Sequence, residues 1–149
     1  MPIGEFCNRD VVFAARDMSV LEGARLMRSY HVGALVVVAD RDGRREPVGI
    51  VTDRDIVVEV VAKEVSPETV QVGEITSNNL MTVREQDGVF DTLQLMRRRG
   101  VRRAPVVDRD GFLLGIVTVD DLVALIAEEM TEVAKLISRE QDREAQTRK

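Results

Sequence analysis

The sequence predicts a mixed α/β (α+β) fold made of two pseudo-symmetric βαββα repeats that pack sheet to sheet. Three observations lead to this prediction. The phrase GIVTDRD at 49–55 returns as GIVTVDD at 115–121, and segment 20–38 aligns with segment 89–107. The runs ALVVV and GIV are apolar at consecutive positions, as expected for strands covered on both faces. An internal duplication whose halves cover each other's sheets accounts for all three.

Each repeat is expected to open with a short strand, at about 11–14 and about 80–83, and to continue into a helix. Apolar residues recur at helical spacing in both helices, at Leu21, Ala24 and Met27 and then at Val89, Leu93 and Met96. Two β-branched strands follow in each repeat, joined by the DRDG turns at 40–43 and 108–111. A closing helix then begins after Thr52 and after Thr118.

Capping signals mark the ends of the first helix in each repeat. Ser19 with Glu22 forms a predicted capping box, and Asp87 is the predicted N-cap of the equivalent helix. Gly100 is a favourable residue at which to end that helix, whereas His31 at the matching position is less typical. These signals predict two helices of similar length at equivalent places.

The repeats and their surroundings divide the chain into four segments. We expect repeat 1 at 8–64, a linker at 65–76 with a short helix around 70–75, repeat 2 at 77–130, and a C-terminal helix with a polar tail at 131–149. The apolar stripe of the last helix continues past Met130, which predicts a homodimer contact there. Beyond Ser138 the sequence is wholly polar, and we expect this tail to fray.

Composition excludes several classes of protein. Aromatic residues make up only 3% of the chain and the net charge is -5, which disfavours a nucleic-acid partner. Cys7 is the only cysteine and His31 the only histidine, so we expect neither an intrachain disulfide nor a metal site. No nucleophile is paired with a base, so we expect no catalysis and no catalytic cofactor. Without a bilayer-spanning stretch or a signal peptide, the prediction is a soluble cytoplasmic protein with no membrane partner.

The duplicated Thr-x-x-Asp pattern has two interpretations. It is a helix capping box, in which Thr52 caps the new helix and Asp55 returns a hydrogen bond to the N-cap amide. It also lies where a strand ends and a helix begins, where backbone amides can meet a ligand. Thr118 and Asp121 repeat both possibilities. The two roles are compatible, and duplication in the same frame favours ligand binding in at least one copy.

Two copies of a helix, a β-branched V-V strand, a turn and G-h-h-T-x-x-D resemble a tandem pair of cystathionine β-synthase (CBS) domains, known as a Bateman module. The resemblance covers roughly residues 8–130. It implies a stand-alone regulatory sensor that binds AMP, ADP or ATP, or else S-adenosylmethionine or NAD(H), in clefts between the repeats. It also implies a homodimer, and a regulated partner protein as the receiver of the signal.

The same resemblance assigns residues to the two clefts. The Asp of each motif would accept ribose hydroxyls, and the Thr would lie beside ribose and phosphate. Cleft 1 would be formed by Thr52, Arg54, Asp55, Thr76, Asn79, Met81, Val101, Arg102, Arg103 and Ala104. Cleft 2 would be formed by Thr118, Asp120, Asp121, Cys7, Asp10, Val12, Val32, Gly33, Ala34 and Leu35.

The two clefts are predicted to be chemically unequal. Cleft 1 has Arg102 and Arg103 where phosphates are expected, which suits a charged nucleotide. Cleft 2 offers Gly33 and Ala34 there, and repeat 1 lacks the proline found at Pro105. We therefore expect tighter nucleotide binding in cleft 1, with cleft 2 preferring a less charged adenosine ligand or remaining empty. The alternative is an interaction or scaffold protein with vestigial clefts that regulates a partner enzyme or transporter.

Overall fold

The computed structural model describes residues 1–77 and 79–148, and it contains two three-stranded sheets of identical topology. In each sheet the first strand pairs parallel to the second, and the second pairs antiparallel to the third. The strands of the first sheet are β1 (Phe13–Ala15), β2 (Ala34–Arg41) and β3 (Arg44–Thr52). Those of the second are β4 (Val83–Arg84), β5 (Arg103–Val107) and β6 (Leu113–Thr118). The predicted duplication of a mixed α/β unit is confirmed.

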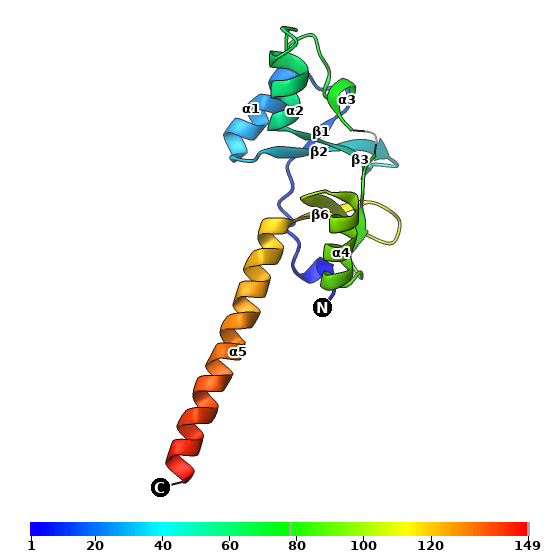
Figure 1. Cartoon of the computed structure of the whole chain (residues 1–149). Helices are drawn as coiled ribbons and strands as arrows, with labels where there is room; N and C mark the ends of the chain where they lie inside the picture. The colour runs from blue at the N-terminus through cyan, green and yellow to red at the C-terminus, as the bar shows by residue number, and fades with distance from the viewer. Residues whose placement is uncertain (78, 149) are drawn as a thin grey trace.

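Helices cover the outer face of each sheet, while the inner faces are directed toward each other (Figure 1). In the first repeat, α2 is extended by a π-helical turn, η2 (Val57–Val61), and a 3₁₀ turn, η1 (Ile3–Glu5), begins the chain. The helices are α1 (Val20–Tyr30), α2 (Asp53–Ile56), α3 (Val72–Ile75), α4 (Val89–Arg99) and α5 (Val119–Thr147). This order reproduces the predicted βαββα unit in both halves.

Each repeat has its own apolar core beneath its helices. In β2, Leu35 and Val37 face the core of repeat 1, and the intervening Val36 is fully buried on the opposite face. In β5, Ala104 and Val106 occupy the equivalent positions in the core of repeat 2. The strands are therefore apolar at consecutive positions because both of their faces are covered.

The N-terminal arm crosses to the second repeat. Ile3 is fully buried in the repeat 2 core, and its N–H donates to the Asp87 carbonyl at 2.7 Å. Asn8 forms a two-way backbone bridge with Ile116, with both N···O distances at 2.9 Å. The linker, in contrast, stays with the first repeat, because Val72 of α3 is buried in the repeat 1 core. The family resemblance placed Cys7 and Asp10 beside Asp121 of repeat 2, but no sequence pattern predicted the burial of Ile3 there.

Two local predictions were wrong. Gly88, and not Asp87, is the N-cap of α4, because the Asp87 carboxylate instead accepts from the Arg84 N–H at 2.9 Å and closes the preceding turn. The polar tail does not fray at Ser138, because α5 is a single helix that extends to Thr147. Ala, Glu, Gln and Arg are strong helix formers, which offsets the absence of apolar residues in this segment.

Helix α5 projects well beyond the rest of the molecule (Figure 1). Its apolar side chains from Met130 onward are exposed, including Val133, Leu136 and Ile137. Across residues 1–77 and 79–148, no helix combines the length and apolarity that a bilayer crossing requires.

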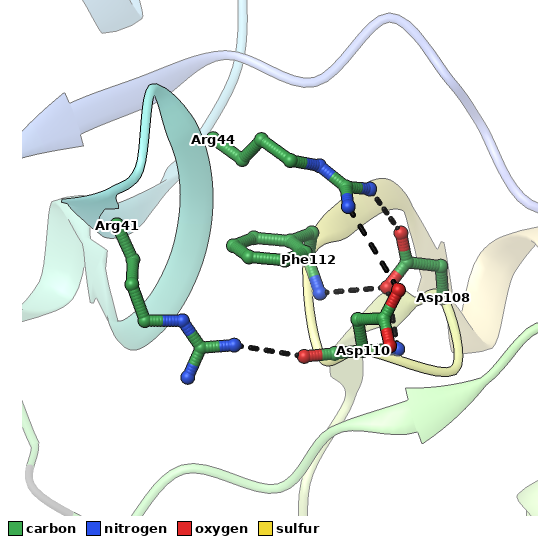
Figure 2. Close-up of polar contacts among 5 residues, drawn as sticks. All are labelled: Arg41, Arg44, Asp108, Asp110 and Phe112. Atoms are coloured by element: carbon green, nitrogen blue, oxygen red, sulfur yellow. Dashed lines mark hydrogen bonds and ion pairs between the residues drawn. The ribbon is translucent and has the colours of Figure 1, made fainter.

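A polar clasp joins the turns of the two repeats (Figure 2). Arg44 is the first residue of β3. Its guanidinium donates to the Asp108 carboxylate at 2.5 Å and lies 3.9 Å from the Asp110 carboxylate. Arg41 donates to the Asp110 carbonyl at 2.9 Å. Both guanidinium groups lie over the Phe112 ring, at 4.7 Å for Arg41 and 4.0 Å for Arg44. The two DRDG segments therefore bind each other, in addition to turning the chain.

The clasp predicts a stability term that is sensitive to acid. The Phe112 N–H, above all, holds the pKa of Asp108 below its ordinary value, assisted by the Asp110 N–H and by Arg44 and opposed by desolvation. A carboxyl whose folded pKa is depressed stabilises the fold above its unfolded pKa of about 3.9 and loses that contribution as pH falls through the folded pKa. Urea unfolding should show Asp108→Asn less stable than wild type at pH 7, with the gap closing toward pH 3. A gap of constant size would contradict this assignment.

Candidate functional site

The two G-I-V-T-x-x-D motifs form complete capping boxes. In repeat 1, Thr52 Oγ1 accepts from the Asp55 N–H at 3.1 Å, and Asp55 Oδ2 accepts from the Thr52 N–H at 2.8 Å. In repeat 2, the Thr118 and Asp121 bonds are both 3.2 Å. Because each Asp uses Oδ2 for the cap, its second carboxylate oxygen has no protein partner among the described residues. Each motif therefore caps a helix and presents a carboxylate oxygen to its surroundings.

The glycine of each motif is required by a chain segment that crosses over it. A Cβ atom at Gly49 would lie 2.1 Å from Thr76 Cγ2 and 3.4 Å from the Ser77 carbonyl oxygen. A Cβ atom at Gly115 would lie 2.7 Å from Cys7 Sγ and 2.8 Å from the Asn8 carbonyl oxygen. The contacts below 3.0 Å, to Thr76 at Gly49 and to Cys7 and Asn8 at Gly115, are too close for any side chain. The glycines thus let the segments that lead into β4 and β1 approach the sheets, where they form walls of the cavities described below.

Gly49→Ala should destabilise the fold by about 1–3 kcal/mol, because the added methyl group overpacks the crossing point. Thr76 has little freedom to retreat, since its hydroxyl donates to the Val72 carbonyl at 2.6 Å. Gly23→Ala is the matched control: its new Cβ would lie 3.4 Å from its nearest neighbour, within a helix that favours alanine. Urea unfolding at neutral pH measures both, and equal stabilities for the two variants would refute the packing argument.

Two cavities beside these motifs are lined by both repeats, and the larger of them has a volume of about 370 Å³, within the range of small-molecule sites. Both repeats contribute to it: β3 and the start of α2 on one side, and the segments preceding β4 and β5 on the other. The predicted cleft 1 residues that line it are Thr52, Arg54, Asp55, Asn79, Met81, Val101, Arg102 and Arg103. The structure thus brings eight of the ten predicted residues to one cavity.

Two predicted residues lie outside this cavity. Thr76 is turned toward Gly49 and hydrogen-bonds to Val72, and Ala104 is fully buried in the repeat 2 core. Four further residues line the cavity although no sequence pattern predicted them: Ile50, Asp53, Ser77 and Leu80. Strand alternation places Ile50 on the same face as Thr52, and this signal could have identified it.

Charged side chains of both signs line the larger cavity: Asp53, Arg54 and Asp55 from repeat 1, and Arg102 and Arg103 from repeat 2. Asp53 faces repeat 1, because its Oδ2 would lie only 3.2 Å from a Cβ atom at Gly33 and its N–H donates to the Gly33 carbonyl. Arg102 makes only a loose ion pair with Asp120, at 3.8 Å, and its side chain is 73% exposed. Its guanidinium therefore remains available to an anion in the cavity.

The smaller cavity has a volume of about 200 Å³ and is also lined by residues of both repeats. Six predicted cleft 2 residues line it, together with Asn8, Val11, Ile116 and Arg103: Thr118, Asp10, Val12, Val32, Gly33 and Ala34. The other four predicted residues do not line it, namely Cys7, Leu35, Asp120 and Asp121. Leu35 is in the core, Asp120 is exposed beside Arg102, and Cys7 packs on Gly115. The two cavities are therefore unequal in size as well as in charge.

Cys7 is held away from both cavities. Its Sγ lies 3.6 Å from the Gly4 carbonyl oxygen, which it contacts as a weak donor. Burial, the largest influence, raises the pKa of the Cys7 thiol above its ordinary value. The thiol is therefore protonated at neutral pH and is a poor nucleophile. In the part of the chain that the structure describes, no cluster of three or more His, Cys, Asp or Glu side chains is arranged to hold a metal ion.

Comparison with known proteins identifies the relatives of this fold. An uncharacterized protein of Methanopyrus kandleri is 39% identical over 135 residues, covering 86% of this chain and 67% of the relative. The solved CBS domain pair of protein MJ0100, in complex with 5′-methylthioadenosine and S-adenosyl-L-methionine, has a TM-score of 0.74 at 25% identity and covers 87% of this chain and 98% of that one. A hexameric CBS-CP12 protein from bloom-forming cyanobacteria has a TM-score of 0.72 at 29% identity, covering 93% and 84% of the two chains.

The family assignment rests on both halves of the chain. The sequence profile of the CBS domain matches residues 3–62 and again residues 72–128. These matches coincide with the two βαββα units, including the N-terminal arm that packs on repeat 2. The chain therefore belongs to the CBS domain family, as a tandem pair of CBS domains.

Proposed function

We propose that this protein is a non-catalytic sensor that binds an adenine nucleotide of the AMP, ADP or ATP type in the larger cavity. The observation that carries the proposal is the cavity itself, a space of about 370 Å³ that is lined by a carboxylate of repeat 1, Asp55, and by two arginines of repeat 2, Arg102 and Arg103. A nucleotide has hydroxyl donors at one part and anionic oxygens at another. The residues of the cavity match both requirements.

Asp55 is the proposed ribose acceptor, with Thr52 beside it. Asp55 Oδ2 is held by the capping bond, which orients Oδ1 to accept from a ribose hydroxyl. Arg102 and Arg103 are the proposed phosphate ligands, because a guanidinium donates in a fork that fits phosphate oxygens. Apolar side chains provide a surface for the adenine ring, namely Ile50, Leu80, Met81 and Val101.

A ligand in this position contacts both repeats, so its binding free energy depends on how they are placed relative to each other. A ligand shifts a conformational equilibrium only through its different affinities for the two states. The two arginines lie just before and at the start of β5, whereas Asp55 lies at the start of α2. We infer that phosphate binding draws the repeats together and that α5 transmits the change through a homodimer to a regulated partner.

An alternative is an interaction or scaffold protein whose clefts are vestigial. The long exposed helix α5 favours it, since an apolar stripe that extends beyond the folded core provides a surface for a protein partner. The two functions differ in their need for a ligand: a scaffold would keep its partner when the larger cavity is empty.

Calorimetric titration tests the proposed function. AMP, ADP, ATP, NADH, S-adenosylmethionine and 5′-methylthioadenosine should be compared on the wild-type protein at physiological salt. We expect AMP-type ligands to bind with about one tight site per chain, and affinity to fall as salt screens the arginines. Failure of every one of these ligands to bind at millimolar concentration would favour the scaffold alternative.

A further inference from the structure

Of the described residues, Arg103 alone lines both the larger and the smaller cavity. It is the first residue of β5, and its neighbour Ala104 points into the repeat 2 core. Strand alternation therefore directs the Arg103 side chain to the opposite face, toward repeat 1 and the space between the two cavities. The equivalent residue of repeat 1 is Ala34, which carries no charge.

The Arg103 guanidinium has no hydrogen-bond or ion-pair partner among the described residues, although the side chain is partly buried. Among the described residues it is also the one cationic side chain in the lining of the smaller cavity, where Asp10 contributes the opposite charge. The larger cavity has Arg54 and Arg102 in addition. An anion in the smaller cavity thus depends on Arg103, whereas an anion in the larger cavity has other cations beside it.

We propose that Arg103 couples the two cavities, so that a phosphate bound in the larger cavity weakens the binding of a phosphate in the smaller one. The inference rests on the proposed nucleotide-binding function and adds a rule for how both cavities are filled. A guanidinium neutralised by one phosphate attracts a second phosphate less, and the two anions repel each other at short range. With its one cation engaged and Asp10 nearby, the smaller cavity then favours an uncharged adenosine group.

Two isoleucines allow each cavity to be observed separately. Ile50 lines the larger cavity and Ile116 the smaller one. Methyl-labelled protein should be titrated with AMP and with adenosine, and the dissociation constant of each cavity read from its own isoleucine. In Asp55→Asn, AMP binds more weakly in the larger cavity, so Arg103 is less often engaged by a phosphate there. We expect the AMP affinity read at Ile116 to rise about tenfold over wild type, while the adenosine affinity there does not change.

Arg103→Gln in the Asp55→Asn background should abolish this gain, and Arg102→Gln in the same background should retain it. The inference is overturned if AMP binds at Ile116 equally well in wild type and Asp55→Asn, if AMP binding is tighter when both cavities are filled, or if removing Arg102 has the same effect as removing Arg103. Each of those results is compatible with nucleotide binding in the larger cavity, as read at Ile50, so the proposed function would stand. If neither AMP nor adenosine shifts either methyl group, the proposed function itself fails, and the coupling with it.

Discussion

Asp55→Asn should lower the affinity for AMP by about 10- to 100-fold, because a hydrogen bond to a charged acceptor contributes about 1.5–3 kcal/mol. Asparagine retains a carbonyl oxygen that can accept from the Thr52 N–H, so the capping bond is preserved. The substitution therefore removes the charge presented to the ribose while the start of α2 is retained. Isothermal titration calorimetry with AMP measures the effect, and urea unfolding checks that stability is unchanged within about 0.5 kcal/mol.

Asp121→Asn is the matched control, since Asp121 occupies the same capping position in repeat 2 but does not line the larger cavity. It should leave the tight AMP site within about twofold of wild type, well below the effect of a lost charged hydrogen bond. Equal losses in both variants would mean that the two motifs act only through the stability of their helices. No loss in Asp55→Asn would remove Asp55 from the binding site.

Most of the fold could be predicted because the sequence is duplicated, so that each structural signal occurs twice at equivalent positions. Thr52 and Thr118 each begin a helix, and both are followed by an Asp at the third position. One copy would be an ordinary capping box, whereas two copies in the same frame locate equivalent strand-to-helix junctions. The spacing of apolar residues predicts helices and strands, but it does not predict a contact made by a single residue. Ile3 is a single apolar residue in a short arm, so its burial in repeat 2 could not be predicted from any pattern.

The tail and the N-cap of α4 show where local rules compete. Asp87 is a good N-cap residue, yet its carboxylate bonds to Arg84 and Gly88 takes the cap position. Residues after Ser138 have no apolar face, but their helix propensity and the Arg148–Glu144 pair at 2.8 Å support helix as far as Thr147. Propensity outweighed the lack of an apolar face in the tail, and turn geometry outweighed propensity at the cap.

The residues of the candidate site could be predicted from their types and positions, but the directions of their side chains could not. The motif and the basic segment before β5 located Asp55, Arg102 and Arg103, which the fold brings to one cavity. Thr76 and Ala104 are adjacent in sequence to cavity residues, but a one-residue step along a strand or turn reverses the direction of the side chain. Arg103 lines both cavities because of how the two repeats face each other, and a sequence pattern does not give that arrangement.

Helix α5 carries a seam that is typical of a coiled coil. Five of its exposed apolar residues are spaced in alternating steps of three and four, as in a heptad repeat, and Leu136 lies beside them: Val123, Ile126, Met130, Val133 and Ile137. They are between 38% and 68% exposed, so the seam is uncovered along its length. A seam of this kind is self-complementary under a twofold axis, and a second copy of the chain is the occupant we propose. The Glu140 and Glu144 side chains continue the heptad and limit its apolar length.

Val133→Asp should convert the proposed dimer to a monomer at micromolar concentration. A carboxylate in the middle of an apolar seam costs on the order of 3 kcal/mol, which weakens association about a hundredfold. Lys135→Asp is the matched control, because it introduces the same residue two positions away on the polar face, where Lys135 pairs with the exposed Glu132. Light scattering after size exclusion measures the mass, and circular dichroism verifies that α5 remains helical.

The two variants separate a seam from a general effect of charge on the helix. A dimer that survives Val133→Asp but not Lys135→Asp would place the contact on the other face of α5. A wild-type monomer would leave the seam open to a different protein, as the scaffold alternative requires. If Val133→Asp dissociates the dimer while AMP still binds, ligand recognition belongs to a single chain, and the dimer is left for the proposed transmission of the signal through α5.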